Sequence, residues 1–282
     1  MNRLITPFDP WKSGMCTCPP KYSLNPYTGC DHRCRYCYST YIPEFFHARP
    51  KKLLLTRLER ELKNLSANAL ISMSNSSDPY PPMERELELT RNALRLMSER
   101  DLRLLVITKS DAVVRDADIL KNMRATISVT VTTLDESIAE KIEPLAPEPG
   151  KRIRALKELK KSDIPVILRL DPVMPGINDE SVEDVLEKAK FVDHVVSSTL
   201  KLRGDSYSRI TKAFPELRER YREMYFRRGE KVGGSWYLNR VLRTGLLSRV
   251  AEVCEDLGVS YAFCREGIPF RAKSCDGSHL AV

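Results

Sequence analysis

Cysteine is the residue type whose spacing in this chain points most directly to chemistry. Cys30, Cys34 and Cys37 form a C-x3-C-x2-C pattern in a short loop. Thiolates are soft ligands, so they favour zinc or iron–sulfur chemistry over calcium or magnesium. A closed zinc site or a fully ligated cluster needs a fourth ligand. Three cysteines alone leave one iron of a four-iron cluster open to a substrate or cofactor.

Four further cysteines lie at the two ends of the chain. Cys16 and Cys18 precede the loop, and Cys264 and Cys275 come near the C-terminus. If the C-terminal segment folds back onto the N-terminal one, these four thiolates form a second site for a [4Fe–4S] cluster or a tetrahedral zinc ion. The alternatives are buried or free thiols, or a hydrogen donor from the C-terminal pair. Cys254 lies among apolar residues of a predicted helix, which favours a place in the core.

Composition limits the class of protein. The chain has 282 residues, of which 42% are hydrophobic and 30% charged, so it can bury a core and is not wholly disordered. No apolar run approaches the roughly 20 residues of a membrane span, and the first residues lack the apolar stretch of a signal peptide. We therefore predict a cytoplasmic protein without a membrane segment, whose cysteines are reduced and available to metals.

Short apolar strands alternate with amphipathic helices through most of the chain. The predicted strands span residues 21–28, 69–74, 103–108, 126–133, 165–170 and 192–197. The predicted helices between and after them span residues 56–66, 83–100, 111–123, 135–142, 151–161 and 181–190. Crossovers of this length join parallel strands, so the pattern predicts an α/β fold of six βα units. Periodicity alone does not distinguish an open sheet from a whole or partial barrel.

The C-terminal region after residue 200 has a different character. The net charge of the chain is +8, and residues 201–250 hold 13 Lys/Arg against 5 Asp/Glu, an excess of 8. Aromatic residues are interleaved with these cations at Tyr207, Tyr221, Tyr225, Phe226, Trp236 and Tyr237. Cations with stacking surfaces are typical of single-strand or flipped-base recognition. The alternative is a solvated basic helix face over residues 215–257, with aromatic residues packed on the barrel. Residues 259–263 (VSYAF) form a further candidate strand.

The cysteine loop is similar to the signature of the radical SAM superfamily, with Tyr36 before the last cysteine. The resemblance implies a partial (βα)6 barrel over residues 22–200, after an extension at 1–21 and before a basic helical region and cysteine-containing tail at 201–282. It also implies that Cys30, Cys34 and Cys37 bind a [4Fe–4S] cluster whose open iron holds S-adenosylmethionine (SAM). An electron from a donor such as a ferredoxin or flavodoxin then cleaves SAM to a 5′-deoxyadenosyl radical, which abstracts hydrogen from a substrate.

The superfamily holds SAM through polar groups at the carboxyl ends of its strands. Transferred to this sequence, the contacts fall on Tyr36, Ser74, Asn75, Ser76, Asp78, Ser128, Thr130, Arg169 and Asp171. Ser128 and Thr130 alternate along one strand and therefore share a face. Arg169 stands in an apolar strand, and because an unpaired buried charge is costly we expect it to have a partner.

Further segments narrow the resemblance to one branch. NPYTGC, SNSSDPYPPME and VITKS resemble the spore photoproduct lyase-like (DNA repair photolyase-like) group. In the spore lyase a cysteine after the second strand returns a hydrogen atom to the product radical, and Asn75 takes its place here. An amide cannot do this, so that mechanism requires another group, such as Tyr80. We expect a nucleobase substrate that docks through residues 201–250. One alternative is an enzyme that modifies a peptide or a small metabolite. The other is a non-enzymatic zinc protein that binds nucleic acid.

Overall fold

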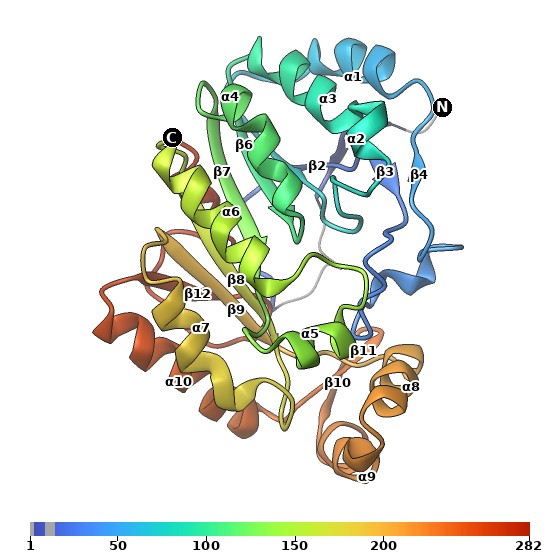
Figure 1. Cartoon of the computed structure of the whole chain (residues 1–282), viewed down its shortest axis with the longest axis vertical. Coiled ribbons are helices and arrows are strands. Elements are labelled where there is room, and N and C mark those ends of the chain that lie inside the picture. Colours follow the sequence, from blue (N-terminus) through green and yellow to red (C-terminus); the bar gives the residue numbers. More distant parts are fainter. Residues whose placement is uncertain (1–2, 9–14) are drawn as a thin grey trace.

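An eight-stranded sheet forms the centre of the computed structural model, which describes residues 3–8 and 15–282 (Figure 1). Its strands, in order across the sheet, are β1 (Thr6–Pro7), β2 (Tyr22–Leu24), β5 (Ala69–Met73), β6 (Leu102–Thr108), β7 (Arg124–Thr130), β8 (Val166–Val173), β9 (His194–Thr199) and β12 (Ser260–Phe263). Neighbours from β2 to β12 pair in parallel, and β1 pairs antiparallel with β2. The six predicted strands are confirmed in this sheet.

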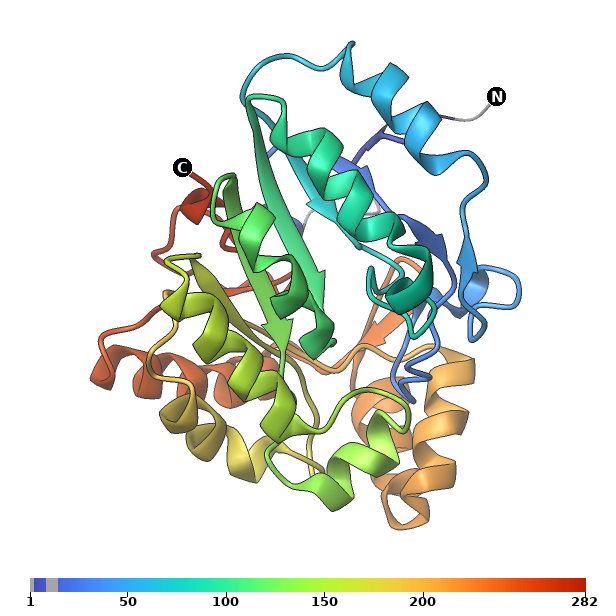
Figure 2. The same ribbon diagram turned by 45° about the horizontal axis from the view of Figure 1, so that its top comes forward.

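Helices surround the sheet: most of them cover its outer face, whereas those of residues 204–221 lie apart from that face, at the carboxyl end of the sheet (Figures 1 and 2). The helices are α1 (Leu54–Leu62), α2 (Glu84–Leu87), α3 (Leu89–Ser98), α4 (Ala117–Leu120), α5 (Glu136–Ile142), α6 (Pro149–Lys161), α7 (Val182–Lys188), α8 (Gly204–Ala213), α9 (Arg218–Tyr221) and α10 (Arg240–Asp256). Leu94, Leu156 and Leu168 are fully buried in the core between the helices and strands, and each such side chain contributes about 1.5–3 kcal/mol. Within the described residues, no helix combines the length and apolar character needed to cross a membrane.

Three predicted elements are interrupted. The helix predicted over residues 111–123 begins as a 3-10 helix (Asp111–Asp116) and continues as the short α4. The first strand ends at Leu24, and β3 (Tyr27–Thr28) pairs instead with β4 (Arg49–Pro50). The helix predicted over residues 83–100 breaks into α2 and α3 at Glu88, which has a φ of 48°. The break is stabilised by Glu84, whose buried carboxylate accepts the first backbone N–H groups of α3. These local hydrogen bonds satisfy amides at the start of α3, which therefore begins as a separate helix.

The C-terminal region is less helical than predicted. Between α9 and α10 the chain forms a π-helical turn (Arg222–Arg227) and a hairpin of β10 (Glu230–Val232) and β11 (Ser235–Tyr237). The hairpin turns at two glycines, a recognised signal for a tight turn that the helical prediction overlooked. Residues 260–263 extend the sheet beside β9, which confirms the further strand.

Candidate functional site

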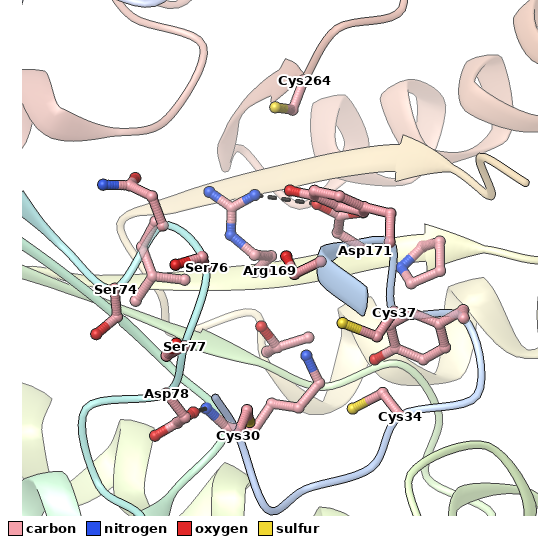
Figure 3. Close-up of a pocket in the computed structure, with 18 of the residues that line it drawn as sticks. Cys30, Cys34, Cys37, Ser74, Ser76, Ser77, Asp78, Arg169, Asp171 and Cys264 are labelled. Atoms are coloured by element: carbon pink, nitrogen blue, oxygen red, sulfur yellow. Dashed lines mark hydrogen bonds and ion pairs between the residues drawn. The ribbon is translucent and has the colours of Figure 1, made fainter. Parts of the chain in front are cut away.

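A cavity of about 460 Å³ lies at the carboxyl ends of the parallel strands, where α/β folds usually bind ligands (Figure 3). The predicted site residues that line it are Cys16, Cys18, Cys30, Cys34, Tyr36, Cys37, Ser74, Asn75, Ser76, Asp78, Thr130, Arg169, Asp171 and Cys264. The fold therefore brings together residues that are up to 248 positions apart in the sequence. Ser128, Tyr80 and Cys275 are not among the lining residues.

The cysteine loop at residues 30–37 is fastened through its backbone. The amide of Arg35 donates to the carbonyl of Ile142 at 2.8 Å. Just before the loop, Gly29 has a φ of +83°, and a Cβ there would lie 2.2 Å from the carbonyl oxygen of His47. A side chain at this position would therefore clash with the backbone, so glycine is required for the loop to fold against its neighbours.

Arg209 of α8 clamps the same loop. Its Nε donates to the carbonyl of Arg35 at 3.1 Å, and its Nη2 donates to the carbonyl of Cys37 at 2.5 Å. Asp205, one turn earlier, holds the guanidinium at 2.6 Å. In Figures 1 and 2 the segment after β3 runs beside α8. Arg209 is one of the 13 cations of residues 201–250 that suggest nucleic-acid binding, but its hydrogen bonds make it part of the support of the cysteine loop.

A buried network lies behind the loop. The hydroxyl of Tyr36 donates to Glu143, which is ion-paired with Arg152. Burial opposes the charge of Glu143, yet Arg152 and Lys109 hold its pKa below the usual value. Burial, together with the nearby charges, raises the pKa of Tyr36 well above its usual value, so this phenol stays a neutral donor. Tyr36 lines the cavity as predicted, but its hydroxyl is already engaged.

The three loop cysteines fit an iron–sulfur cluster. Burial raises the pKa of all three thiols, that of Cys30 to about 12. Lys109 lies close enough to Cys34 for their charges to interact. Among the described residues, no three His, Cys, Asp or Glu side chains are placed to hold a single metal ion. A four-iron cluster makes no such demand, because each cysteine binds a different iron.

The carboxylate of Asp78 connects the carboxyl ends of β5 and β6 through hydrogen bonds. It accepts hydrogen bonds from the hydroxyl of Thr108 at 2.8 Å, the amide of Lys109 at 2.8 Å and the amide of Tyr80 at 3.0 Å. His32 lies 3.5 Å away through Nδ1. The carboxylate thus ties the loop after β5 to the end of β6. It lines the cavity with most of its hydrogen-bonding capacity already used.

Ser74 and Asn75 differ in their freedom to bind a ligand. Ser74 has a φ of 74°, and its buried hydroxyl has no hydrogen-bond partner within the described chain. Such strain and an orphaned polar atom in a cavity wall are marks of a ligand site, and they fit a SAM contact. The amide of Asn75 is held by the hydroxyls of Ser23 at 2.9 Å and Ser72 at 2.8 Å. Asn75 is therefore a fixed part of the wall.

Arg169 has the partner that its place in an apolar strand required. Its Nη1 lies 3.1 Å from the carboxylate of Asp171, as Figure 3 shows. Ser198 donates to the other oxygen of Asp171 at 2.6 Å. Burial opposes ionisation of Asp171, but the charge of Arg169 keeps the pKa of this carboxyl below its usual value. Ser128 touches Arg169 at 3.4 Å from within the barrel, which makes it a support of Arg169 and not a lining residue.

Tyr80 lies outside the cavity. Its side chain is 3% exposed and belongs to the main apolar core. Its amide, not its hydroxyl, contacts the site through Asp78. Tyr80 is therefore not among the residues that line the cavity, and its catalytic role stays a prediction.

Much of the basic segment at residues 201–250 is neutralised within the fold. Arg243 is 2% exposed and pairs with Glu230 at 2.8 Å, and Arg249 pairs with Glu183 at 2.8 Å. The fully buried aromatic residues of the segment are Tyr221, Tyr225 and Tyr237. These three rings pack in the interior, as the alternative interpretation held, and cannot stack on bases.

The exposed aromatic residues at the cavity come from elsewhere. Tyr38 and Tyr41, just after the cysteine loop, line the cavity and are 36% and 56% exposed. The guanidinium of Arg203 lies 5.3 Å from the ring centre of Tyr41, and that of Arg209 lies 5.2 Å from that of Phe46. These aromatic residues were not predicted as part of the site, although the aromatic-rich run YCYSTYIPEFF around the last loop cysteine was a signal for them.

Sequence comparison places the chain among known proteins. The family model of the Radical SAM superfamily matches residues 24–189. An uncharacterized protein of Methanocaldococcus jannaschii is 31% identical over 229 residues, which cover 79% of this chain and 85% of that protein. Protein ORF301 of Acidianus two-tailed virus is 27% identical over 209 residues, covering 65% of this chain and 68% of its own.

Structural comparison agrees with this placement. Spore photoproduct lyase complexed with dinucleoside spore photoproduct matches with a TM-score of 0.69 at 14% identity, over 86% of this chain and 76% of that one. SuiB of Streptococcus suis matches with a TM-score of 0.54 at 15% identity, over 86% of this chain and 48% of that one. At these identities the likeness shows a shared fold. Together with the family model and the archaeal relative, it establishes that the chain belongs to the radical SAM superfamily.

Proposed function

We propose that this radical SAM enzyme abstracts a hydrogen atom from a nucleobase in DNA or RNA. The observation that carries the proposal is the mouth of the cavity. Tyr38 and Tyr41 present partly exposed rings there, and the guanidinium of Arg203 lies beside the ring of Tyr41. Bases stack on aromatic rings, and guanidinium groups bind phosphates, so this surface suits a nucleotide substrate.

The cavity walls offer sites for the cofactors of the superfamily. Cys30, Cys34 and Cys37 would hold a [4Fe–4S] cluster, while Ser74 and Arg169 are the best placed SAM contacts. Asn75, Ser76, Thr130 and Asp171 complete the same wall. When bound, these groups supply a 5′-deoxyadenosyl radical that removes hydrogen from the substrate.

The residues of the chain then have separate tasks. Lys109 places a positive charge beside the thiolate of Cys34, which favours the negatively charged cluster. Arg209 fixes the loop that carries the cysteines. Arg169, held by Asp171, presents cationic N–H groups that can receive a carboxylate of the ligand. A small electron-transfer protein, such as a ferredoxin or flavodoxin, is our proposed electron donor.

The structural neighbour supports the substrate class but not an identical reaction. Spore photoproduct lyase has been seen with a dinucleoside lesion, and it shares the fold of this chain. The thiol that returns a hydrogen atom in that enzyme is replaced here by Asn75, whose amide is held by Ser23 and Ser72. We therefore propose a repair or modification reaction on a nucleobase that uses no thiol at this position. Membership in the superfamily argues against the non-enzymatic zinc protein.

Label transfer tests the proposal. The chain, reconstituted anaerobically with iron and sulfide, is reduced in the presence of SAM and deuterated oligonucleotides. We expect the oligonucleotide to accelerate the formation of 5′-deoxyadenosine and to transfer deuterium into it, and the Cys34→Ala variant to do neither. If SAM is cleaved but deuterium comes only from labelled peptides or small metabolites, the substrate class is wrong. If no 5′-deoxyadenosine forms under any of these conditions, the proposed reaction itself is wrong.

A further inference from the structure

Four of the five cysteines outside the cluster loop, Cys16, Cys18, Cys264 and Cys275, come from the two ends of the chain and lie close together in the fold. The sulfurs of Cys18 and Cys275 are 3.3 Å apart, although 257 positions separate these residues in the sequence. Cys16, two residues before Cys18, lines the same cavity. Cys264 follows β12 directly and lines the cavity together with Cys16 and Cys18. All four are free thiols, so a set of thiol ligands is present that the proposed reaction does not use.

Three of these cysteines share the cavity of the first set. Cys16, Cys18 and Cys264 line it, while Cys275 is 1% exposed and lies behind them. In Figure 3, Cys264 lies on the other side of Arg169 from Cys30 and Cys34. The two cysteine sets therefore occupy different walls of one cavity.

Separate contacts hold the N-terminal and C-terminal segments together at this point. Lys21 and Asp276 form an ion pair whose side chains are 2% and 3% exposed. A Cβ on Gly267 would lie 3.9 Å from the side chain of Met15. A buried ion pair is costly unless its geometry is well maintained. The meeting of the two segments is therefore a defined part of the fold.

We propose that Cys16, Cys18, Cys264 and Cys275 bind a second [4Fe–4S] cluster in the cavity wall. Four thiolates are the complete ligand set for such a cluster and leave no iron open to substrate. A zinc ion would need at least three ligands around one point, and the described residues contain no such group. A cluster needs its four sulfurs farther apart, so Cys18 and Cys275 must separate when it binds.

Local structure permits this separation. Cys18 and Cys275 lie in segments without helix or strand, so their side chains can rotate without disturbing the sheet. Lys21 lies near these sulfurs, but its charge is already paired with Asp276, so the cluster would rely on its four thiolate ligands and not on a free cation. Cys254 provides a contrast, since it is a thiol of the apolar core with no place in either set.

Counting iron and acid-labile sulfide tests the second site without reference to SAM cleavage. The reconstituted wild type should contain about eight iron atoms per chain, which corresponds to two cubane clusters. A Cys30→Ala, Cys34→Ala, Cys37→Ala variant should retain about four, because the second set is intact. Its remaining electron paramagnetic resonance signal should not change when SAM is added. Cys18→Ser combined with Cys275→Ser should also leave about four.

Cys254→Ser is the matched control for iron counting, and three results would contradict a second cluster. The Cys254→Ser variant should keep the full iron content, because that thiol lies in neither set. Absence of cluster iron from the triple-alanine variant would overturn the proposal, whatever the wild type does with SAM. So would about one zinc per chain that disappears in the Cys18/Cys275 variant, or a Cys18–Cys275 disulfide in the anaerobically reconstituted wild type. The proposed reaction depends on Cys30, Cys34 and Cys37, so it stands or fails separately.

Discussion

The cysteine loop at residues 30–37 and the basic segment at residues 201–250 are the two most distinctive parts of the sequence, and the fold uses them in opposite ways. The thiols of the loop line a cavity. Its backbone is held in place by contacts at Arg35, Gly29 and Arg209. In the basic segment, cations such as Arg243 and Arg249 face acidic residues of the chain itself. A distinctive composition indicates an external partner only where the fold leaves its side chains available.

The two regions also meet. Arg209 belongs to the basic segment by sequence, yet it donates to two carbonyls of the cysteine loop. Arg203 lies over Tyr41 at the cavity mouth. These two arginines link the segment to the site. The following experiments separate them from cations that serve only the fold or the surface.

Removal of a cluster ligand should have the largest effect. In Cys34→Ala, SAM cleavage should fall to background, because the first cluster loses one of its three thiolates. Production of 5′-deoxyadenosine under reducing, anaerobic conditions measures it. Cys254→Ala is the matched control, and it should retain activity because this thiol lies in the core. Equal loss in both variants would show that general destabilisation is responsible.

The second largest effect should come from breaking the buried ion pair between Arg152 and Glu143, which lies behind the cysteine loop. Arg152→Met leaves the carboxylate of Glu143 buried and unpaired, which should lower the free energy of unfolding by about 3–5 kcal/mol. Urea denaturation of the cluster-free protein measures the change. Arg227→Met removes an exposed arginine and should leave the midpoint unchanged. A similar shift in both variants would contradict the distinction between buried and surface cations.

Arg209→Ala should weaken the support of the cluster loop without unfolding the protein. Loss of its hydrogen bonds to Arg35 and Cys37 should reduce cluster affinity or SAM cleavage by about 10–100-fold, as is usual for groups that orient metal ligands. Iron retention during challenge with a chelator gives a readout independent of activity. Lys212→Ala, an exposed change on the same helix, is the control. Unchanged iron retention and turnover in Arg209→Ala would remove this arginine from the site.

The dependence of the free energy of unfolding on pH, measured at acidic pH, should report on the contact between the two ends of the chain. Lys21 lowers the pKa of Asp276 to about 2 against burial, which opposes the charge. A carboxyl with a lowered pKa stabilises the fold above its unfolded pKa, and this contribution disappears as pH falls through the folded value. We expect a loss of about 2 kcal/mol between about pH 4 and pH 2 in the cluster-free protein. Asp276→Asn should lack this component, and an identical pH dependence in both proteins would contradict it.

The smallest effect concerns the substrate surface. Arg203→Ala should lower oligonucleotide affinity by about five-fold, on the scale of one cation–π or phosphate contact of about 1 kcal/mol. Arg227→Ala should leave affinity unchanged, because that arginine pairs with Glu223 on the surface. Fluorescence anisotropy at constant salt measures both. An equal loss of oligonucleotide affinity in the two variants would show that binding depends on the general positive charge of the surface and not on the mouth of the cavity.

Several features were within reach of the sequence because they depend on local pattern. Apolar runs between helices predicted the six strands, and the spacing of Cys30, Cys34 and Cys37 predicted their metal chemistry. The resemblance to the superfamily indicated Ser74, directly after β5, and Arg169, within β8, as ligand contacts, and both line the cavity.

Tertiary structure decided which of these side chains remain available to a ligand. Asp78 and Asn75 are occupied by hydrogen bonds, and Tyr80 points into the core. The contact between Cys18 and Cys275 depends on chain ends that only the folded sheet brings together. Spacing along the chain predicts which residues lie near one another in a loop or share a strand face. Whether a charged group or a thiol has a partner depends on atoms from distant segments of the chain. The local sequence around a residue does not reveal these contacts.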